Sequence, residues 1–371
     1  MQQGDLLPWV EKYRPESLEE LISHKDIIGT ISKFINSGQL PHLLFHGPPG
    51  TGKTSTIHAL SKFIYGEKKK QMVLELNASD DRGINVVRDA IKSFAESAST
   101  NMDCFEDIQT RAESGTTNLI FNRNFWQNVK LIILDEADMM TPVAQMALRR
   151  ILEKYSEHVR FCIICNYVNK IIPALQSRCT RFRFSPLFIN EMENKILVIS
   201  KAEGIYTSKD GITALIEAAR GDMRKVLNIL QSCHMDNYGN IHEYMSSCDF
   251  TIMDENTNTY INGQMVHKTL GIPTSKEIDF LMNTLTNKTF SEGTNALMNY
   301  YREYGYATQD FVNLLYRRLL KINWPDSVIP LIMKRLADIE YRLSCGASET
   351  VQFSAIVSCI CEVRLELEKL L

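Results

Sequence analysis

Short apolar runs alternate with amphipathic segments in the first half of this 371-residue chain. Four of the runs are bounded by polar or glycine-rich turns, and each predicts a buried strand. They cover residues 43–46, 73–77, 130–134 and 159–165. Apolar residues recur at helical spacing in the stretches 27–35, 55–63, 85–97 and 142–154. Strands that alternate with helices predict an α/β fold built on a parallel sheet.

The second half of the chain predicts mainly helices. One helix begins after Gly221 and Asp222, with apolar residues at helical spacing from Met223 to Leu230. Further helices follow from residue 268 onward. They cover Ser275–Thr284, Thr308–Ile322, Ser327–Ser344 and Val351–Leu371. Their apolar stripes indicate packing against one another or against neighbouring subunits.

Two stretches lack a periodic pattern. Residues 97–127 are rich in Ser, Thr, Asn and Asp and predict an insertion, because a structureless loop of this length is unusual in a compact domain. Residues 237–267 are weakly patterned and predict a linker. The chain is too long for one core. We therefore predict an α/β domain over 1–186, a small helical domain over 187–250 with the linker to about 267, and an all-α domain over 268–371.

Composition narrows the class of protein. The chain is 44% hydrophobic and 23% charged, as is usual for globular proteins in water. Its net charge of −3 means that any surface for nucleic acid must be a local patch. No apolar run approaches the length of a membrane span, and no basic region followed by an apolar core predicts a signal peptide. We therefore expect no membrane contact.

Nine cysteines are scattered along the chain. Cys162 and Cys165 have the spacing of half a metal site, but no second pair completes one. They fall in a predicted strand, which directs side chains three positions apart to opposite faces. We interpret them as reduced core residues, which fits an intracellular protein.

One motif organises the first domain. Residues Gly47-Pro48-Pro49-Gly50-Thr51-Gly52-Lys53-Thr54, here called the glycine loop, match G-x-x-x-x-G-K-[ST] between a predicted strand and a predicted helix. In this context the N–H groups of the loop and the helix N-terminus surround a phosphate. Lys53 then reaches the β- and γ-phosphates, and the Thr54 hydroxyl binds Mg²⁺. The alternative, a chance glycine turn, is disfavoured by the flanking strand and helix.

Polar side chains follow two of the predicted strands. Asp135 and Glu136 come directly after the run 130–134, at the edge where parallel sheets bind ligands. Asp135 is placed to hold hydrated Mg²⁺, and Glu136 to orient the attacking water or accept its proton. The alternative for this acidic pair is a helix cap. Asn166 follows the next strand, where its amide would bond the γ-phosphate, the water or the following turn.

Three further segments carry candidate binding groups. The segment from Pro8 to Pro15 is expected to be extended, since a proline stands at each end, and its aromatic rings would pack over a purine or cap the core. Arg178 is either an exposed charge or a finger that stabilises a transferring phosphoryl group. Arg224 lies in the first turn of a helix, where a cation opposes the helix dipole, so we expect an anionic partner.

Six motifs together resemble the AAA+ ATPase family, and within it the small subunits of replication factor C, the sliding-clamp loader. The motifs are Trp9–Pro15, Gly47–Thr54, Glu75–Ile84, Leu134–Asp138, Ala147–Arg150 and Ser177–Cys179. Thr180–Phe184 and Ala337–Ser344 are most similar to the subunit numbered 5 in animals and 3 in fungi. The resemblance covers nearly the whole chain. It lapses at 97–127, where the family has a shorter connection, and weakens at 237–267.

The resemblance implies an AAA+ P-loop NTPase domain with a parallel sheet and a small helical lid, followed by an all-α collar. It implies ATP and Mg²⁺ as cofactors, Asn166 as the first sensor and Arg224 as the second. The residues implied around the adenine are Val10, Tyr13, Arg14 and Pro15. Those implied around the phosphates are Gly47, Pro48, Pro49, Gly50, Thr51, Gly52, Lys53, Thr54 and Ser55. Arg178 would complete the site of an adjacent subunit in trans, so the implied catalytic set is Glu136, Lys53, Asn166 and Arg178.

The partners implied by the resemblance are four other replication factor C subunits, the sliding clamp PCNA and primer–template DNA, in the nucleus. Arg82, Arg88 and Lys92 match family positions that contact backbone phosphates, which position a protein without reading sequence. Without the resemblance, Arg88 and Lys92 are two cations one helical turn apart. An ordinary solvent-exposed helix face accounts for them as well as DNA contacts do.

The implied function is ATP-dependent opening and loading of the clamp. One alternative is a ring or checkpoint subunit that binds nucleotide without hydrolysing it, and the presence of Glu136 disfavours it. Another is a different AAA+ motor, such as a helicase or an unfolding machine. We find no pore loop or strand-separating element for such a motor, and the helical last third fits a collar better.

Overall fold

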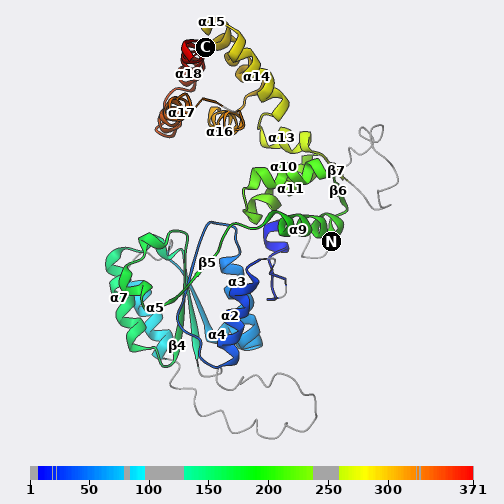
Figure 1. Ribbon diagram of the computed structural model, residues 1–371. Coiled ribbons are helices and arrows are strands. Elements are labelled where there is room, and N and C mark those ends of the chain that lie inside the picture. The colour runs from blue at the N-terminus through cyan, green and yellow to red at the C-terminus, as the bar shows by residue number, and fades with distance from the viewer. Residues whose placement is uncertain are drawn as a thin grey trace. The chain divides into compact units, whose positions relative to one another are not determined.

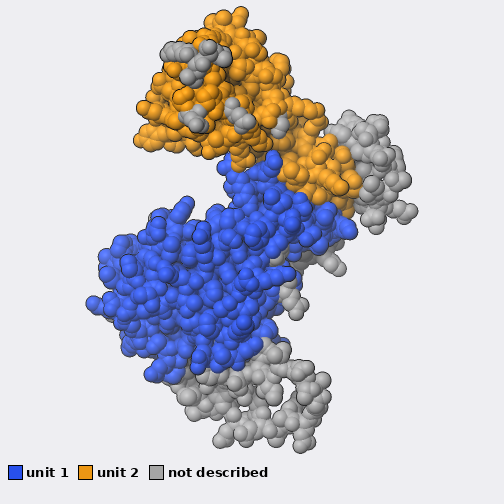
Figure 2. Space-filling model, in the orientation of Figure 1, with its two compact units in different colours: residues 1–203, 216–228 blue, residues 204–215, 229–371 orange. Residues whose placement is uncertain are grey.

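The computed structural model describes most of the chain. The described residues are 7–18, 20, 21, 23–78, 84–96, 129–236, 259–322, 324, 325 and 327–370. They form two compact units, which Figure 2 colours separately. Unit 1 contains residues 1–203 and 216–228, and unit 2 contains residues 204–215 and 229–371. The predicted insertion at 97–127 lies outside the described residues, and the domain boundaries near 186, 250 and 267 remain predictions.

Unit 1 is built on a sheet of five parallel strands in the order β2-β3-β4-β1-β5. The strands are β1 (Leu43–His46), β2 (Val73–Asn77), β3 (Lys130–Asp135), β4 (Val159–Cys165) and β5 (Thr180–Arg183). The first four coincide with the predicted apolar runs, so the predicted parallel α/β fold is confirmed. The central strands β1 and β4 are buried along almost their whole length. This double burial explains why they show continuous apolar runs instead of alternation.

Helices cover both faces of the sheet (Figure 1). On one face lie α5 (Ile84–Glu96) and α7 (Pro142–Lys154). On the other lie α2 (Lys25–Asn36), α3 (Lys53–Tyr65) and α4 (Lys69–Met72). The apolar stripe of each longer helix is buried against the strands, as the periodicity predicted.

Cys162 and Cys165 belong to opposite faces of the sheet, as predicted for a strand. Cys165 packs in the core under α7, and Cys162 packs in the core under α3. Both are free thiols, and burial raises the pKa of each, that of Cys165 to about 12. Within the part of the chain that the structure describes, no cluster of His, Cys, Asp or Glu is arranged to hold a metal ion.

The prediction for the segment from Pro8 to Pro15 is wrong. We expected an extended segment, but residues Trp9–Lys12 form a helical turn, α1. Pro8 is compatible with this turn because it precedes the helix, and its carbonyl accepts a hydrogen bond from the Lys12 N–H at 2.9 Å. Pro15 restricts only Arg14, the residue before it. Unit 1 also contains the short elements η2 (Gly66–Lys68), η5 (Ala137–Met139), η6 (Val168–Lys170) and α8 (Pro173–Gln176), and the longer helix α9 (Ile189–Ala202).

The division between the units crosses α10 (Lys209–Ala219) and α11 (Met223–Asp236). In unit 2, β6 (Ile205–Thr207) and β7 (Thr259–Ile261) form a parallel two-stranded sheet, and α13 (Gly263–Leu270) follows. The linker expected over 237–267 is therefore wrong from residue 259 onward. A three-residue strand is too short to show a period, and β7 is held by pairing with β6, far upstream in the chain.

After α13, the described residues of unit 2 are mainly helical, as predicted. Its helices are α14 (Ser275–Asn287), α15 (Phe290–Tyr304), α16 (Thr308–Leu319), α17 (Ile329–Ser344) and α18 (Glu349–Leu370). A capping box of Thr274 and Glu277 begins α14. Apolar residues such as Leu315 and Ile356 are fully buried between the helices and form a core of their own. None of the described helices is long and apolar enough to cross a membrane.

Candidate nucleotide-binding site

The glycine loop joins the end of β1 to the start of α3 in unit 1. Its backbone has positive φ at Gly47 (148°), Gly50 (69°) and Gly52 (90°), a region that L side chains rarely adopt. A Cβ on Gly47 would lie 2.1 Å from the carbonyl oxygen of Phe184, so side chains are excluded there by contact as well. The predicted context of strand, loop and helix is confirmed.

Lys53 and Asn166 meet beside this loop. The Lys53 ammonium is buried, with the residue only 7% exposed. It donates to the carbonyls of Gly47 and Pro48, both at 2.8 Å, and to Asn166 Oδ1 at 3.0 Å. Burial lowers the pKa of Lys53; the Asp135 carboxylate opposes this shift, and the Arg224 guanidinium adds to it.

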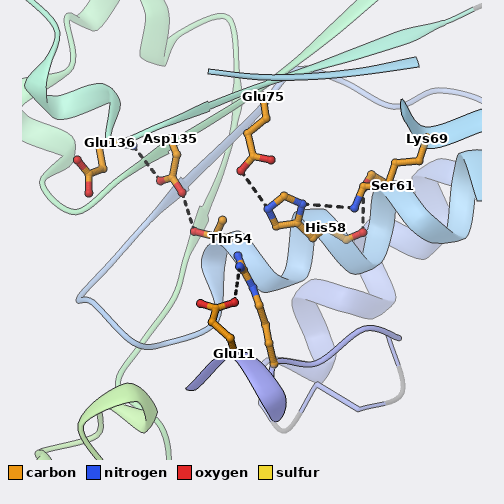
Figure 3. Close-up of polar contacts among 9 residues, drawn as sticks. Glu11, Thr54, His58, Ser61, Lys69, Glu75, Asp135 and Glu136 are labelled. Atoms are coloured by element: carbon orange, nitrogen blue, oxygen red, sulfur yellow. Dashed lines mark hydrogen bonds and ion pairs between the residues drawn. The ribbon is translucent and has the colours of Figure 1, made fainter. Parts of the chain in front are cut away.

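Thr54 and Asp135 also come together, from α3 and the end of β3. The Thr54 hydroxyl donates to Asp135 Oδ2 at 2.9 Å (Figure 3). Asp135 Oδ1 accepts the Glu136 N–H at 2.8 Å, and Glu136 is exposed. The φ of Glu136 is 52°, a left-handed value that is uncommon for a residue with a side chain and often marks a functional site.

A pocket opens beside the loop. Val10, Tyr13, Arg14 and Pro15 line one part of it, and Arg224 lines another. From the loop and α3 it is lined by Gly50, Thr51, Gly52, Thr54 and Ser55. The remaining predicted loop residues are not in the lining but belong to the same loop; they are Gly47, Pro48, Pro49 and Lys53. The structure therefore brings the predicted adenine and phosphate residues to one place.

The segment that contains α1 has one aromatic ring in the interior and another at the pocket, and its packing over a purine stays a prediction. Trp9 is 5% exposed and caps the core, whereas its neighbours Val10 and Tyr13 line the pocket. The Tyr13 hydroxyl donates to the Glu203 carboxylate, and Lys12 forms an ion pair with the same carboxylate at 2.6 Å. Burial and the Glu203 carboxylate raise the pKa of Tyr13. These contacts attach α1 to the end of α9.

Sequence reasoning missed several pocket residues. They are Glu11, Leu21, Ser23, His24, Thr56, Leu187, Lys195, Met223 and Leu227. Most are apolar or belong to segments without a motif, so no local signal marks them. Lys195 is different, because it is a cation on α9 and adds positive charge to a pocket that Arg14 and Arg224 also line. Only the folded chain places it there.

Arg178 lies away from the pocket of its own chain. It precedes β5, whose first residue Thr180 pairs with Leu43, the first residue of β1. The glycine loop follows the opposite end of β1. The Arg178 guanidinium is half-exposed, forms an ion pair with Glu153 at 2.6 Å and donates to the Ala174 carbonyl at 2.8 Å.

The three predicted DNA contacts are only partly described. Arg82 lies outside the described residues. Arg88 lies on α5, but its side chain is outside the described set. Lys92 lies one turn later on α5 and is exposed.

Comparisons with known proteins give a consistent result. The family model "ATPase family associated with various cellular activities (AAA)" matches residues 43–187, and "Replication factor C C-terminal domain" matches residues 273–359. "Probable replication factor C subunit 5" of Dictyostelium discoideum is 43% identical over 96% of this chain and 91% of its own length. "Replication factor C subunit 3" of Schizosaccharomyces pombe is 42% identical over 95% of this chain and 90% of its own.

Similarity to solved structures is weaker. The RuvB Holliday junction branch migration motor of Thermotoga maritima aligns with a TM-score of 0.48 at 14% identity, over 77% of this chain and 85% of that one. A likeness at this level carries no functional meaning.

Proposed function

This chain belongs to the replication factor C subunit family, and from that premise we propose that it is an ATP-hydrolysing subunit of a clamp loader. The loader opens the sliding clamp PCNA and loads it onto primer–template DNA. The main support for ATP hydrolysis by this chain is the arrangement of Lys53, Thr54 and Asp135 beside the glycine loop. The exposed Glu136 follows Asp135 in the chain.

ATP is the nucleotide in this proposal. Its adenine lies against Val10, Tyr13, Arg14 and Pro15, and its phosphates lie on the loop from Gly47 to Ser55. Two cations support a polyanion there, the buried Lys53 and the pocket residue Arg224. Burial is the main cause that lowers the pKa of Lys53, and repulsion by the Arg224 guanidinium lowers it further. A triphosphate between them relieves this repulsion.

The metal in this proposal is Mg²⁺, held by Thr54 and Asp135. Their hydroxyl and carboxylate oxygens are hard donors of the kind that Mg²⁺ prefers, and one or two protein oxygens are usual where phosphates supply further ligands. When bound, the ion neutralises charge on the β- and γ-phosphate oxygens.

Hydrolysis in this proposal depends on Glu136 and Asn166. Glu136 orients the attacking water and accepts its proton, a task that suits an exposed carboxylate at the end of a strand. Asn166, which already bonds Lys53, holds the γ-phosphate or the water. Arg224 contacts the phosphates of its own chain, and Arg178 completes the site of the adjacent subunit.

The proposed assembly is a nuclear pentamer with four other replication factor C subunits. The collar, residues 268–371, joins the subunits, the α/β domain covers 1–186 and the lid covers 187–250. Arg82, Arg88 and Lys92 contact backbone phosphates of the DNA, in keeping with the overall negative charge of the chain, which calls for a local basic patch.

The decisive experiment is purification of the native assembly followed by mass measurement. We expect four related subunits and a bound clamp, and ATP hydrolysis by the assembly that far exceeds hydrolysis by the isolated chain. A verified monomer that hydrolyses ATP as fast as the assembly would contradict the role of Arg178. An assembly whose hydrolysis does not change with Glu136→Gln in this subunit would favour a subunit that only binds nucleotide.

A further inference from the structure

The connection between α10 and α11 is an unusual turn next to the pocket. Arg220 and Gly221 both have positive φ, 54° and 85°. A Cβ on Gly221 would lie 2.7 Å from Pro186 Cβ, and the Leu187 N–H donates to the Gly221 carbonyl at 3.3 Å. The turn is thus held against the segment that leaves β5, and Asp222 follows it directly.

Asp222 caps α11. Its Oδ1 accepts the N–H groups of Arg224 at 2.9 Å and Lys225 at 3.3 Å. A carboxylate at a helix N-terminus interacts favourably with the helix dipole and with unbonded N–H groups. The cap offsets the unfavourable placement of two cations in the first turn. It accepts the backbone N–H of Arg224 and not its guanidinium, so the anionic partner expected for that side chain stays a prediction.

The same carboxylate lies directly on the glycine loop. A Cβ at Gly50 would lie 1.6 Å from Asp222 Oδ1 and 2.2 Å from its carboxyl carbon. The next residue, Met223, donates its N–H to the Gly50 carbonyl at 3.3 Å. Only a glycine leaves room for this contact. Two residues later in the same helix, Arg224 lines the pocket together with Gly50 and Thr54.

We propose that Asp222 is a positioning residue that joins the start of α11 to the glycine loop and so directs Arg224 at the bound nucleotide. This inference rests on the proposed function of Arg224. Asp222 makes two separate contributions: its oxygen caps the helix, and its length brings the carboxyl group against Gly50.

Two variants separate the contributions. Asp222→Asn keeps both the capping oxygen and the length of the side chain, so we expect ATP to bind as to the unaltered chain. Asp222→Ser keeps a capping oxygen, and therefore the fold, but is too short to reach Gly50. We expect it to weaken ATP binding about tenfold, as for the loss of one interaction with a charged group.

A double-mutant cycle tests whether Asp222 acts through Arg224. The full-length chain in its native complex is titrated with a fluorescent ATP analogue, with Asp222→Ser, Arg224→Ala and both changes together. We expect the double variant to bind no more weakly than Arg224→Ala alone. The matched control is Asn262→Ala, which removes the cap of α13 (Asn262 accepts the Met265 N–H at 2.8 Å) and should leave ATP binding unchanged.

The outcomes are distinct. If Arg224→Ala weakens binding but Asp222→Ser does not, or if the two effects add fully, the positioning role of Asp222 is wrong and the proposed function stands. If Arg224→Ala itself leaves ATP binding unchanged, the proposed role of Arg224 is wrong, and the inference falls with it.

Discussion

Lys53 connects the glycine loop to the end of β4. Its ammonium is buried and donates to two loop carbonyls and to the Asn166 amide oxygen. A buried charge is costly unless it has such acceptors. The sequence left three partners open for Asn166, and the partner in this structure is Lys53, a residue more than a hundred positions away.

Glu136→Gln tests the proposed activation of water. The amide keeps the shape of the side chain but cannot accept a proton, so hydrolysis at this site should fall at least about a hundredfold while ATP still binds. Single-turnover hydrolysis and equilibrium titration on the assembled complex measure the two effects. Glu157→Gln, an exposed carboxylate of the same unit, is the control. Loss of ATP binding would remove Glu136 from the catalytic role.

His58 and Glu75 form a pair that sequence reasoning did not anticipate. His58 Nε2 on α3 lies 3.1 Å from Glu75 Oε1 on β2, and Lys69 lies beside the same imidazole (Figure 3). The hydrogen bond from His58 is the main cause that lowers the pKa of Glu75 below its ordinary value of 4.5. The pair joins the edge strand of the sheet to the helix that follows the glycine loop.

The pair makes stability depend on pH. Because the pKa of Glu75 is lowered by folding, its contribution is present above about pH 4.5 and is lost as the pH falls through the folded pKa. His58→Ala should therefore lower the free energy of unfolding at pH 6 and have less effect at pH 3.5. The difference should stay below about 1 kcal/mol, since the pair is partly exposed. Urea unfolding at both pH values measures it, and equal effects at both would refute the prediction.

Among the helices and strands, α7 is the one whose start is most clearly specified by neighbouring residues in the sequence. Thr141 precedes it and accepts the Ala144 N–H at 3.3 Å, and Pro142 is its first residue. Both features depend only on residues within one turn, so the local sequence is sufficient to specify them. The helix carries Glu153, the partner of Arg178, so the position of α7 also affects that arginine.

Thr141→Ala should destabilise the chain by about 1 kcal/mol, the usual effect of removing an N-cap. Thr213→Ala is a matched control, since Thr213 lies on the exposed face of α10 and bonds only a carbonyl of its own helix. Alanine is well tolerated at such a site. Urea unfolding of the full chain compares the two variants. Equal destabilisation would mean that the Thr141 cap contributes nothing of its own.

At the scale of the whole molecule, the position of Arg178 bears on assembly. It lies at the amino end of β5, whereas the glycine loop lies at the carboxyl end of the paired strand β1. A side chain at the opposite edge of the sheet is too far from the glycine loop of its own chain to contact a nucleotide bound there. Its guanidinium is partly exposed and bonded to Glu153, which is compatible with the proposed contact with a neighbouring subunit.

Arg178→Ala should leave ATP binding by this chain unchanged and reduce hydrolysis at the neighbouring site of the assembly by about a thousandfold or more. Single-turnover hydrolysis by assemblies in which only that neighbouring site is active measures the effect. Arg181→Ala, which removes an exposed arginine of β5, is the control. If the isolated chain loses ATP affinity instead, Arg178 acts within its own subunit.

The local sequence pattern was sufficient to predict the strands around the glycine loop and the positions of Asp135 and Asn166 at strand ends. It also specifies the Thr141 cap. Each depends on residues close in the chain, where periodicity and capping act. The same reasoning was wrong about α1, because prolines at both ends of a segment permit one helical turn between them. It was also wrong about β7, whose three residues have no period of their own.

Contacts between distant residues required the folded chain. The strand order β2-β3-β4-β1-β5 brings Asp135 to Thr54 and Asn166 to Lys53, and the α10–α11 turn brings Asp222 onto Gly50. No local preference encodes such pairs, because their stability comes from packing and hydrogen bonds that exist only once the intervening elements have closed over the core.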